Sequence, residues 1–184
     1  IGEGSGANTM GRPIIWTARD IRCDLGGGLA PRPGHFNIDL IPEADIVFDL
    51  NSGLPSDWPD DSIDAFFASH LIEHLHTIIP LMNDVYRTLK PGGIFEGSTP
   101  YAGTTEYWQD PTHKHGFVEN SFAYFVENSP FQKEQKQYGI TARFVVHRAE
   151  RGTGVDAWQL LFELRKPKRL WRDPSVPLPR SYDR

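Results

Sequence analysis

Short apolar runs that end at a carboxylate or a glycine turn alternate with polar segments in the first part of the chain. Residues 20–25, 36–40 and 44–50 are such runs, and their length and flanking turn residues predict β-strands. Residues 62–69 form a fourth run that is apolar almost throughout, as expected for a strand buried on both faces. The pattern therefore predicts four strands of a buried sheet.

The apolar spacing changes to a helical period after the fourth run. From Thr77 to Leu89 the apolar residues stand three or four positions apart, and Pro80 falls in the first turn, where its missing N–H does little harm. We expect Thr77 to be the N-cap of this helix. Its predicted apolar face carries Ile78, Leu81, Val85 and Leu89. The turn at residues 90–93 should end the helix, and a fifth strand is expected over 94–98.

The second half of the chain is less regular. Residues 99–117 form a long, polar, aromatic-rich segment that predicts a loop, and residues 121–127 predict a short helix. Two further apolar runs, 140–148 and 157–166, flank Gly152-Thr153-Gly154. This arrangement is typical of a β-hairpin. Strands followed by helical segments place the chain in the α/β class.

The connection between the first two strands is unusually short. Only residues 29–35 separate the glycine turn from the second strand, and they include Pro31 and Pro33. A crossover between parallel strands normally needs a dozen or more residues and contains a helix. We therefore expect the first crossover helix to be reduced to a loop.

The composition is that of a water-soluble globular protein. The 184 residues suffice for one domain with a sizeable core, and 39% of them are hydrophobic. The longest apolar stretch, residues 65–82, is interrupted by polar and charged side chains, so we expect no membrane span. The only cysteine, Cys23, cannot form an internal disulfide. This and the lack of a secretion signal at the start favour a cytoplasmic location.

The formal net charge of −5 is unevenly distributed. Residues 165–184 hold seven Lys or Arg against two Asp or Glu, so this end carries +5 and the remainder −10. An acidic body argues against nucleic acid as the main partner, because such binding depends on cationic contacts to phosphates. We expect residues 1–9 to be an appended remnant or an unstructured terminus, residues 10–166 to be the domain, and residues 167–184 to be a basic, proline-rich tail.

Candidate binding residues stand where the predicted strands end. In an open α/β sheet, ligands bind outside the carboxyl ends of the strands. The first strand ends in Asp24-Leu25-Gly26-Gly27-Gly28, and the next two end at Asp39 and Asp49. Glycine lets the backbone approach a ligand closely, and a carboxylate one strand away can accept both hydroxyls of a ribose. The series predicts a nucleoside-containing ligand.

Five motifs in a fixed order resemble the class I S-adenosylmethionine-dependent methyltransferases. They are Asp24-Leu25-Gly26-Gly27-Gly28, Asp39, Asp49 with Leu54-Pro55, Ser69-His70-Leu71-Ile72-Glu73-His74-Leu75, and Leu89-Lys90-Pro91-Gly92-Gly93. The last two resemble a branch with an S-H-x-x-E-H-L … L-K-P-G-G signature. The resemblance covers about residues 22–100. It implies a single-domain, Rossmann-like fold with a mostly parallel seven-stranded sheet that ends in an antiparallel hairpin.

The resemblance also implies S-adenosylmethionine as the cofactor and a role for each matching position. Asp24, Gly26, Gly27 and Gly28 would line the methionine end. Asp39 and the adjacent Leu40 would lie at the ribose, Asp49 and Leu50 at the adenine edge, and Ser69 and His70 would close the pocket. A protein that holds this cofactor in a regulatory role, without methyl transfer, is the alternative.

The acceptor side is expected in residues 99–130, as a loop or lid. Methyl transfer is an in-line displacement that benefits from a nearby general base. His113 or His115 suits that role, Asp110 could orient one of them, and Tyr101 could stack on the acceptor or face the sulfonium. Alternatively, Asp110-Pro111-Thr112-His113 is a rigid turn whose histidine caps backbone groups. We expect a small-molecule acceptor and O- or N-methylation.

A metal-binding pattern overlaps the cofactor motif. His70-x-x-Glu73-His74 has the spacing of a class of zinc hydrolases, and His76, His113 or His115 could complete a metal site. The motif directly follows a buried strand and precedes a Lys-Pro-Gly-Gly turn, which is the methyltransferase context. We therefore expect no metal site, with zinc hydrolysis as a remote alternative.

Overall fold

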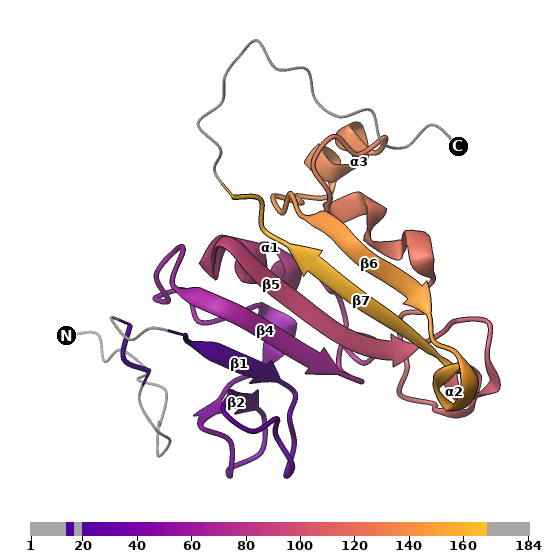
Figure 1. Cartoon of the computed structure of the whole chain (residues 1–184), viewed down its shortest axis with the longest axis horizontal. Coiled ribbons are helices and arrows are strands. Elements are labelled where there is room, and N and C mark those ends of the chain that lie inside the picture. The colour runs from indigo at the N-terminus through magenta and orange to yellow at the C-terminus, as the bar shows by residue number, and fades with distance from the viewer. Residues whose placement is uncertain (1–13, 17–19, 169–184) are drawn as a thin grey trace.

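The computed structural model describes residues 14–16 and 20–168, and a twisted seven-stranded sheet forms its centre (Figure 1). The strand order is β3-β2-β1-β4-β5-β7-β6. The first five strands run parallel, and β7 is antiparallel to both of its neighbours. The strands are β1 (Arg22–Leu25), β2 (Phe36–Asp39), β3 (Ile46–Val47), β4 (Ile63–Ser69), β5 (Leu89–Pro100), β6 (Val145–Arg151) and β7 (Gln159–Arg165). The predicted α/β fold, a mostly parallel sheet ending in an antiparallel hairpin, is confirmed.

All helical elements of the described residues come after β3 in the chain. The α-helices are α1 (Ile79–Thr88), α2 (Thr105–Gln109) and α3 (Gln132–Gln137), and the short 3₁₀ turns are η1 (Leu50–Ser52), η2 (Glu119–Phe125) and η3 (Gly154–Asp156). In Figure 1, α1 passes behind the sheet at β4 and β5. Of the predicted apolar face, Leu81 and Val85 lie within α1 and are fully buried, as is Leu89 directly after it. Ile78 is the N-cap and is partly buried against the core.

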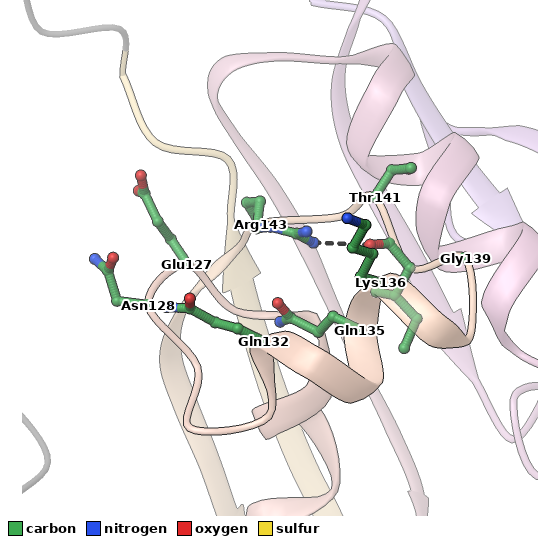
Figure 2. Close-up of a pocket in the computed structure, with 9 residues that line it drawn as sticks. Glu127, Asn128, Gln132, Gln135, Lys136, Gly139, Thr141 and Arg143 are labelled. Atoms are coloured by element: carbon green, nitrogen blue, oxygen red, sulfur yellow. Dashed lines mark hydrogen bonds between the residues drawn. The ribbon is translucent and has the colours of Figure 1, made fainter.

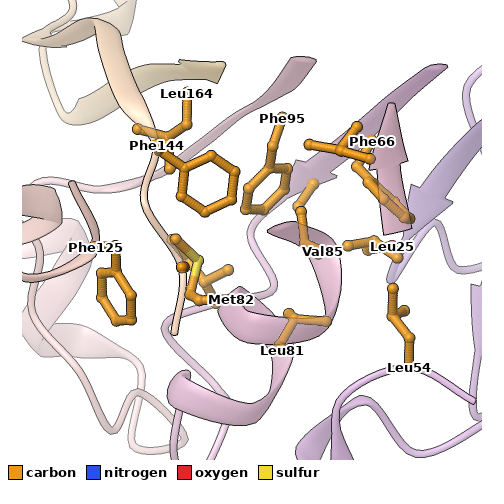
Figure 3. Close-up of a cluster of buried hydrophobic side chains, with 14 of the residues drawn as sticks. Leu25, Leu54, Phe66, Leu81, Met82, Val85, Phe95, Phe125, Phe144 and Leu164 are labelled. Carbon is orange, nitrogen blue, oxygen red and sulfur yellow. The ribbon is translucent and has the colours of Figure 1, made fainter. Parts of the chain in front are cut away.

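The hydrophobic core lies between α1 and the sheet and continues toward η2 (Figure 3). Phe66 of β4, Phe95 of β5 and Phe144 are fully buried there, with Val85 of α1. The ring of Phe95 packs edge-on against Phe162 of β7, with centroids 5.2 Å apart. Cross-strand aromatic packing of this kind joins the antiparallel hairpin to the parallel part of the sheet.

Several predicted boundaries differ from the observed ones. The third strand has only two residues instead of seven, because the Asp49 carboxylate accepts the N–H of Asn51 and caps η1. Helix α1 begins at Ile79 with Ile78 at its N-cap, so the predicted cap at Thr77 is wrong. The predicted turn at 90–93 is part of β5, which starts directly after α1. The predicted helix at 121–127 is the 3₁₀ turn η2, and α2 lies in the predicted loop.

Loops replace the helices that usually connect the first strands. Residues 26–35, all of which are described, contain no helix, so the predicted reduction of the first crossover is confirmed. The loop covers part of the sheet instead. The guanidinium of Arg32 lies 4.3 Å from the ring centre of Phe67 on β4 and pairs with Glu96 of β5 at 2.7 Å.

Two of the predicted segments lie wholly or mostly outside the described residues. Residues 1–9 lie outside the described part, and of the tail at 167–184 only residues 167 and 168 are described. Within the described part, no helix combines the length and apolar character that crossing a membrane requires.

Candidate cofactor and acceptor site

A glycine turn ends β1, and its first two glycines leave no room for side chains. The N–H of Gly26 donates to the carbonyl of Ile38 on β2 at 2.8 Å, and its φ is +70°, a conformation that favours glycine. A Cβ at Gly27 would lie 2.7 Å from Oδ1 of Asn37 and 2.9 Å from Oδ2 of Asp24. The backbone at Gly27 is therefore packed directly against the side chains of Asp24 and Asn37.

Asp39 holds the end of this turn. Its Oδ2 accepts the N–H of Gly28 at 3.0 Å, and its Oδ1 accepts the N–H of Leu40 at 2.6 Å. The two oxygens of an ionised carboxylate together accept about four hydrogen bonds, so Oδ2 retains acceptor capacity. Asp39 is half-buried. The structure thus places the predicted ribose carboxylate beside the glycine turn.

Asp24 lies beneath the turn and is 3% exposed. Its Oδ2 accepts the backbone N–H of Arg32 at 2.7 Å. Loss of solvation raises the pKa of the Asp24 carboxyl above its ordinary value, and the hydrogen bond from Arg32 partly offsets the rise. The neighbouring Asn37 is also buried, and its Oδ1 accepts no hydrogen bond from any described residue. The site therefore contains two buried polar groups with spare acceptor capacity.

A cavity of about 370 Å³ opens at this point, outside the carboxyl ends of β1 and β4. Its lining residues are Asp24, Gly26, Gly27, Ala30, Arg32, Phe67 and Ser69. Four of these are predicted cofactor residues. Sequence reasoning missed Ala30, Arg32 and Phe67. The replacement of the crossover helix by a short loop was a signal that this loop would line the site, whereas Phe67 is indistinguishable from its apolar neighbours on β4.

The remaining predicted cofactor positions are placed differently. Leu50 is 4% exposed and belongs to the hydrophobic core, whereas Leu40 is 64% exposed. Oδ1 of Asp49 accepts both the backbone and the side-chain N–H of Asn51, and these bonds hold the pKa of Asp49 below its ordinary value. None of these three residues lines the cavity, and neither do Gly28, Asp39 and His70. The assignment of these residues to the cofactor stays a prediction.

The end of β4 leads from the cavity to the acceptor side. Oγ of Ser69 lies 3.1 Å from Oγ of Ser98 on β5. His70 follows with a φ of +54°, which is unfavourable outside glycine, and its ring stacks on Trp158 with centroids 5.1 Å apart. Its Nδ1 lies 3.3 Å from Oε1 of the buried Glu73. His70 therefore connects the cavity wall to the turn after β4.

Two of the predicted acceptor-side residues lie together. Nδ1 of His113 is 2.7 Å from the carbonyl oxygen of Tyr107, and its Nε2 is 3.7 Å from Oδ2 of Asp110. The His113 side chain is only 6% exposed. Oδ1 of Asp110 accepts the backbone N–H and the hydroxyl of Thr112, and these bonds lower the pKa of Asp110. The predicted turn is present and brings Asp110 close to His113, and the orienting role of Asp110 stays a prediction.

The other two predicted acceptor-side residues, His115 and Tyr101, bind to different partners. Nε2 of His115 lies 3.2 Å from the carbonyl oxygen of His76. The hydroxyl of Tyr101 donates to Oε2 of Glu119 at 3.1 Å, which raises the pKa of the tyrosine. Neither residue is brought to His113 by a hydrogen bond, and their catalytic roles stay predictions.

Comparison with known proteins places this geometry in context. Residues 39–96 match a family profile described as a methyltransferase domain. A chain of the complex between the Haloferax volcanii Trm112 methyltransferase activator and a methyltransferase superposes with a TM-score of 0.54 at 15% identity, covering 80% of this chain and 83% of that one. The chain has the class I methyltransferase fold. No curated protein sequence matches it.

Two other solved structures share this methyltransferase fold. The S-adenosylmethionine-dependent methyltransferase of Mesorhizobium loti is 17% identical, with 79% of this chain and 90% of that chain covered and a TM-score of 0.51. The 1,6-didemethyltoxoflavin-N1-methyltransferase of Burkholderia thailandensis, with bound 1,6-didemethyltoxoflavin and S-adenosylhomocysteine, is 15% identical, with 80% and 71% covered and a TM-score of 0.51. At such identities, the likeness establishes the fold alone.

A second pocket, about 550 Å³, lies beside α3 and is lined by Glu127, Lys136 and Arg143 among others (Figure 2). Two of its polar side chains, Arg143 and Gln135, make hydrogen bonds to nearby backbone carbonyls. Arg143 donates to the carbonyls of Ile140 and Ala142, and the side-chain amide of Gln135 donates to the carbonyl of Val126. We therefore place the candidate site at the ends of β1 and β4.

Proposed function

We propose that this protein is an S-adenosylmethionine-dependent methyltransferase that acts on a small-molecule acceptor. The observation that carries the proposal is the cavity at the ends of β1 and β4, where the glycine turn meets the buried carboxylate of Asp24. In open α/β sheets this position is the general ligand-binding site. The methyltransferase profile over residues 39–96 supports the same cofactor.

The chemistry of the lining fits the proposed cofactor. The methionine part of S-adenosylmethionine carries an ammonium group, for which the Asp24 carboxylate is a suitable partner. Its ribose diol can donate to the acceptor capacity that remains on Asp39. A volume of about 370 Å³ falls in the range of small-molecule sites, roughly 300–1,000 Å³. The face of Phe67 supplies apolar surface.

The proposal also covers where the methyl acceptor binds and what kind of molecule it is. We place it against residues 99–130, which follow β5 and carry exposed aromatic groups such as Trp108. A small molecule methylated on oxygen or nitrogen suits the acidic body of the chain, which offers little to a polyanion. The small-molecule substrate of the Burkholderia thailandensis enzyme is consistent with this choice.

Calorimetric titration with S-adenosylmethionine and S-adenosylhomocysteine tests the cofactor. We expect micromolar affinity, about 8 kcal/mol. The variant Asp39→Asn keeps the size of the side chain but loses its charge, and we expect it to bind about 10- to 100-fold more weakly, because charge-assisted hydrogen bonds are worth about 1.5–3 kcal/mol. Glu43→Gln removes a charge from an exposed neighbour and should leave the affinity unchanged. Equal affinities for both variants would exclude Asp39 from the site.

Methyl transfer needs a separate measurement. Mass spectrometry of a panel of small hydroxyl- and amine-containing acceptors, incubated with the protein and S-adenosylmethionine, should reveal a product heavier by one methylene. Tight cofactor binding with no product across the panel would favour the regulatory alternative. Product formed with RNA but with no small molecule would contradict the acceptor class.

A further inference from the structure

Three metal-ligating side chains converge beside the proposed acceptor region. Glu73 and His74 lie in the turn after β4, His113 lies in the loop before η2, and one potential ligand atom from each falls within 4.8 Å of the others. The two segments are joined by backbone bonds, since Lys114 and His115 donate their N–H groups to the carbonyl of Glu73 at 2.7 and 3.2 Å. Their convergence is therefore built into the fold.

Hydrogen bonds orient the ring of His74 toward this point. The hydroxyl of Thr112 donates to Oδ1 of Asp110 at 2.6 Å, so its oxygen is left to accept a bond from Nδ1 of His74 at 2.9 Å. Nδ1 therefore donates, and Nε2 is the ring nitrogen that can bind a metal through its lone pair. A second partner that fixes the tautomer in this way is typical of metal-binding histidines.

His113 is oriented in the same way. A carbonyl oxygen only accepts, so Nδ1 of His113 must donate to the carbonyl of Tyr107, 2.7 Å away. Nε2 is again the nitrogen that can bind a metal. The ring also stacks on that of Tyr107, with centroids 5.4 Å apart, and lies 4.7 Å from the ring of His74. In both rings the hydrogen bonds occupy Nδ1 and leave Nε2 as the potential metal ligand.

Glu73 supplies a buried negative charge that lacks full compensation. The residue is 0% exposed, its Oε2 accepts the hydroxyl of Thr99 at 2.9 Å, and its Oε1 accepts no hydrogen bond from any described residue. The nearest charge partner in the described part is Nδ1 of His70 at 3.3 Å, on a side chain that is 35% exposed. A buried carboxylate with one hydrogen bond is costly unless a cation accompanies it.

We propose that Glu73, His74 and His113 bind one divalent transition-metal ion of the zinc type. Two imidazole nitrogens and one carboxylate oxygen form a donor set that suits Zn²⁺ rather than Mg²⁺, which prefers oxygen. Tetrahedral bonds of about 2.0–2.2 Å put ligand atoms roughly 3.4 Å apart, so small side-chain rotations would close the 4.8 Å cluster. The fourth position stays open for an oxygen ligand.

This site differs from both sequence-based expectations. The zinc-hydrolase pattern pairs His70 with His74, but His70 stacks on Trp158 and is not one of the three converging side chains. The ligand role also replaces the base role expected for His113, because a nitrogen bonded to a metal cannot take up a proton. Metal binding does not depend on the proposed methyl transfer, since it is measured without cofactor or acceptor.

Titration of the chelator-treated full chain with Co²⁺ tests the proposal. We expect one Co²⁺ per chain, a visible d–d absorption of a site with nitrogen ligands, and displacement by equimolar Zn²⁺ but not by millimolar Mg²⁺. His74→Ala and His113→Ala should each weaken binding by at least about 100-fold, the upper end of the effect of losing an outer-shell partner. Thr112→Val, which removes the group that orients His74, should weaken it by about 10- to 100-fold.

His76→Ala is the matched control, because His76 is an exposed histidine two residues from His74 and outside the cluster. Its affinity should stay within about twofold of the unaltered protein. Circular dichroism on each variant separates loss of the site from loss of the fold, and His74→Ala tests the proposal even if His113→Ala fails to fold. Absence of stoichiometric binding, equal losses in His74→Ala and His76→Ala, or displacement by Mg²⁺ would each overturn the proposal.

Discussion

At the scale of single residues, the site depends on groups that are costly to bury. Asp24 is 3% exposed, and its position beneath the glycine turn raises the pKa of its carboxyl. For an acid, a raised folded-state pKa means that ionisation is less favourable in the folded chain than in the unfolded one. The free energy of unfolding should therefore fall as the pH rises from the unfolded value of about 3.9 through the folded one.

Because ionised Asp24 is costly to bury, the variant Asp24→Asn should be more stable than the unaltered protein but should bind the cofactor more weakly. The amide oxygen can still accept the N–H of Arg32, but the buried charge is gone. We expect a higher free energy of unfolding than in the unaltered protein at about pH 7, a smaller difference at about pH 4, and at least about tenfold weaker binding of S-adenosylmethionine. Urea unfolding at both pH values and calorimetry measure the two effects. A variant that is less stable at neutral pH would contradict the desolvation argument.

At the scale of elements, one side chain joins helix α1 to the segment before β6. Nδ2 of Asn83 donates to the carbonyl of Gly139 at 2.8 Å, and its Oδ1 accepts the N–H groups of Thr141 and Ala142 at 2.8 and 3.2 Å. These bonds replace a regular strand over residues 140–144, where the sequence predicted one. The apolar pattern of that segment comes from core residues such as Ala142 and Phe144, which are fully buried without belonging to a strand.

Asn83→Ala should therefore destabilise the fold although no apolar side chain is removed. It leaves two backbone N–H groups and one carbonyl without their partner. Gly139 and Thr141 are exposed, but Ala142 is buried, and a buried unsatisfied group costs about 1–3 kcal/mol. We expect a loss of that order in urea unfolding. Asn83→Asp keeps the acceptor and should recover about half or more of the loss at neutral pH. Full stability in Asn83→Ala would mean that water satisfies these backbone groups.

The elements themselves were largely predictable because their signals are local. Four strands and α1 were found from apolar spacing, and the missing first crossover followed from two prolines in seven residues. A strand at the position of β3 was predicted, but its length of two residues was not, because its end depends on the Asp49 side chain capping η1. The start of α1 was missed by two residues for a similar reason. Oγ1 of Thr77 accepts only a long bond of 3.4 Å from the N–H of Ile79 and makes no cap.

At the scale of the whole molecule, the arrangement of the site depends on contacts between distant segments. The sequence identified Asp24 and the glycines, but not that Arg32 would lie on Phe67 and pair with Glu96, 64 residues away. It also listed Glu73 and His113 without linking them. Their convergence results from two backbone bonds between residues about 40 apart, and no local pattern encodes such a contact.

Because one continuous core supports both sites, a ligand at either should stabilise the entire chain. A ligand that binds only the folded state adds RT ln(1 + [L]/Kd), about 2.7 kcal/mol at a concentration 100 times Kd. For a chain of this length, each kcal/mol raises Tm by roughly 2–4 °C. We therefore expect saturating S-adenosylhomocysteine to raise Tm by about 5–11 °C in differential scanning calorimetry.

The same scan separates the two proposals. Asp39→Asn should lose most of the shift caused by S-adenosylhomocysteine and keep the shift caused by Zn²⁺, whereas His74→Ala should show the reverse. When both ligands are present, the free energies they add should sum within about 0.5 kcal/mol if the sites are independent. A combined effect well above that sum would mean that His70, which lies between Ser69 of the cavity and Glu73 of the cluster, couples cofactor binding to metal binding. If neither S-adenosylhomocysteine nor Zn²⁺ raised the Tm of the unaltered protein, both assignments would be contradicted, because a ligand that binds the folded chain must stabilise it.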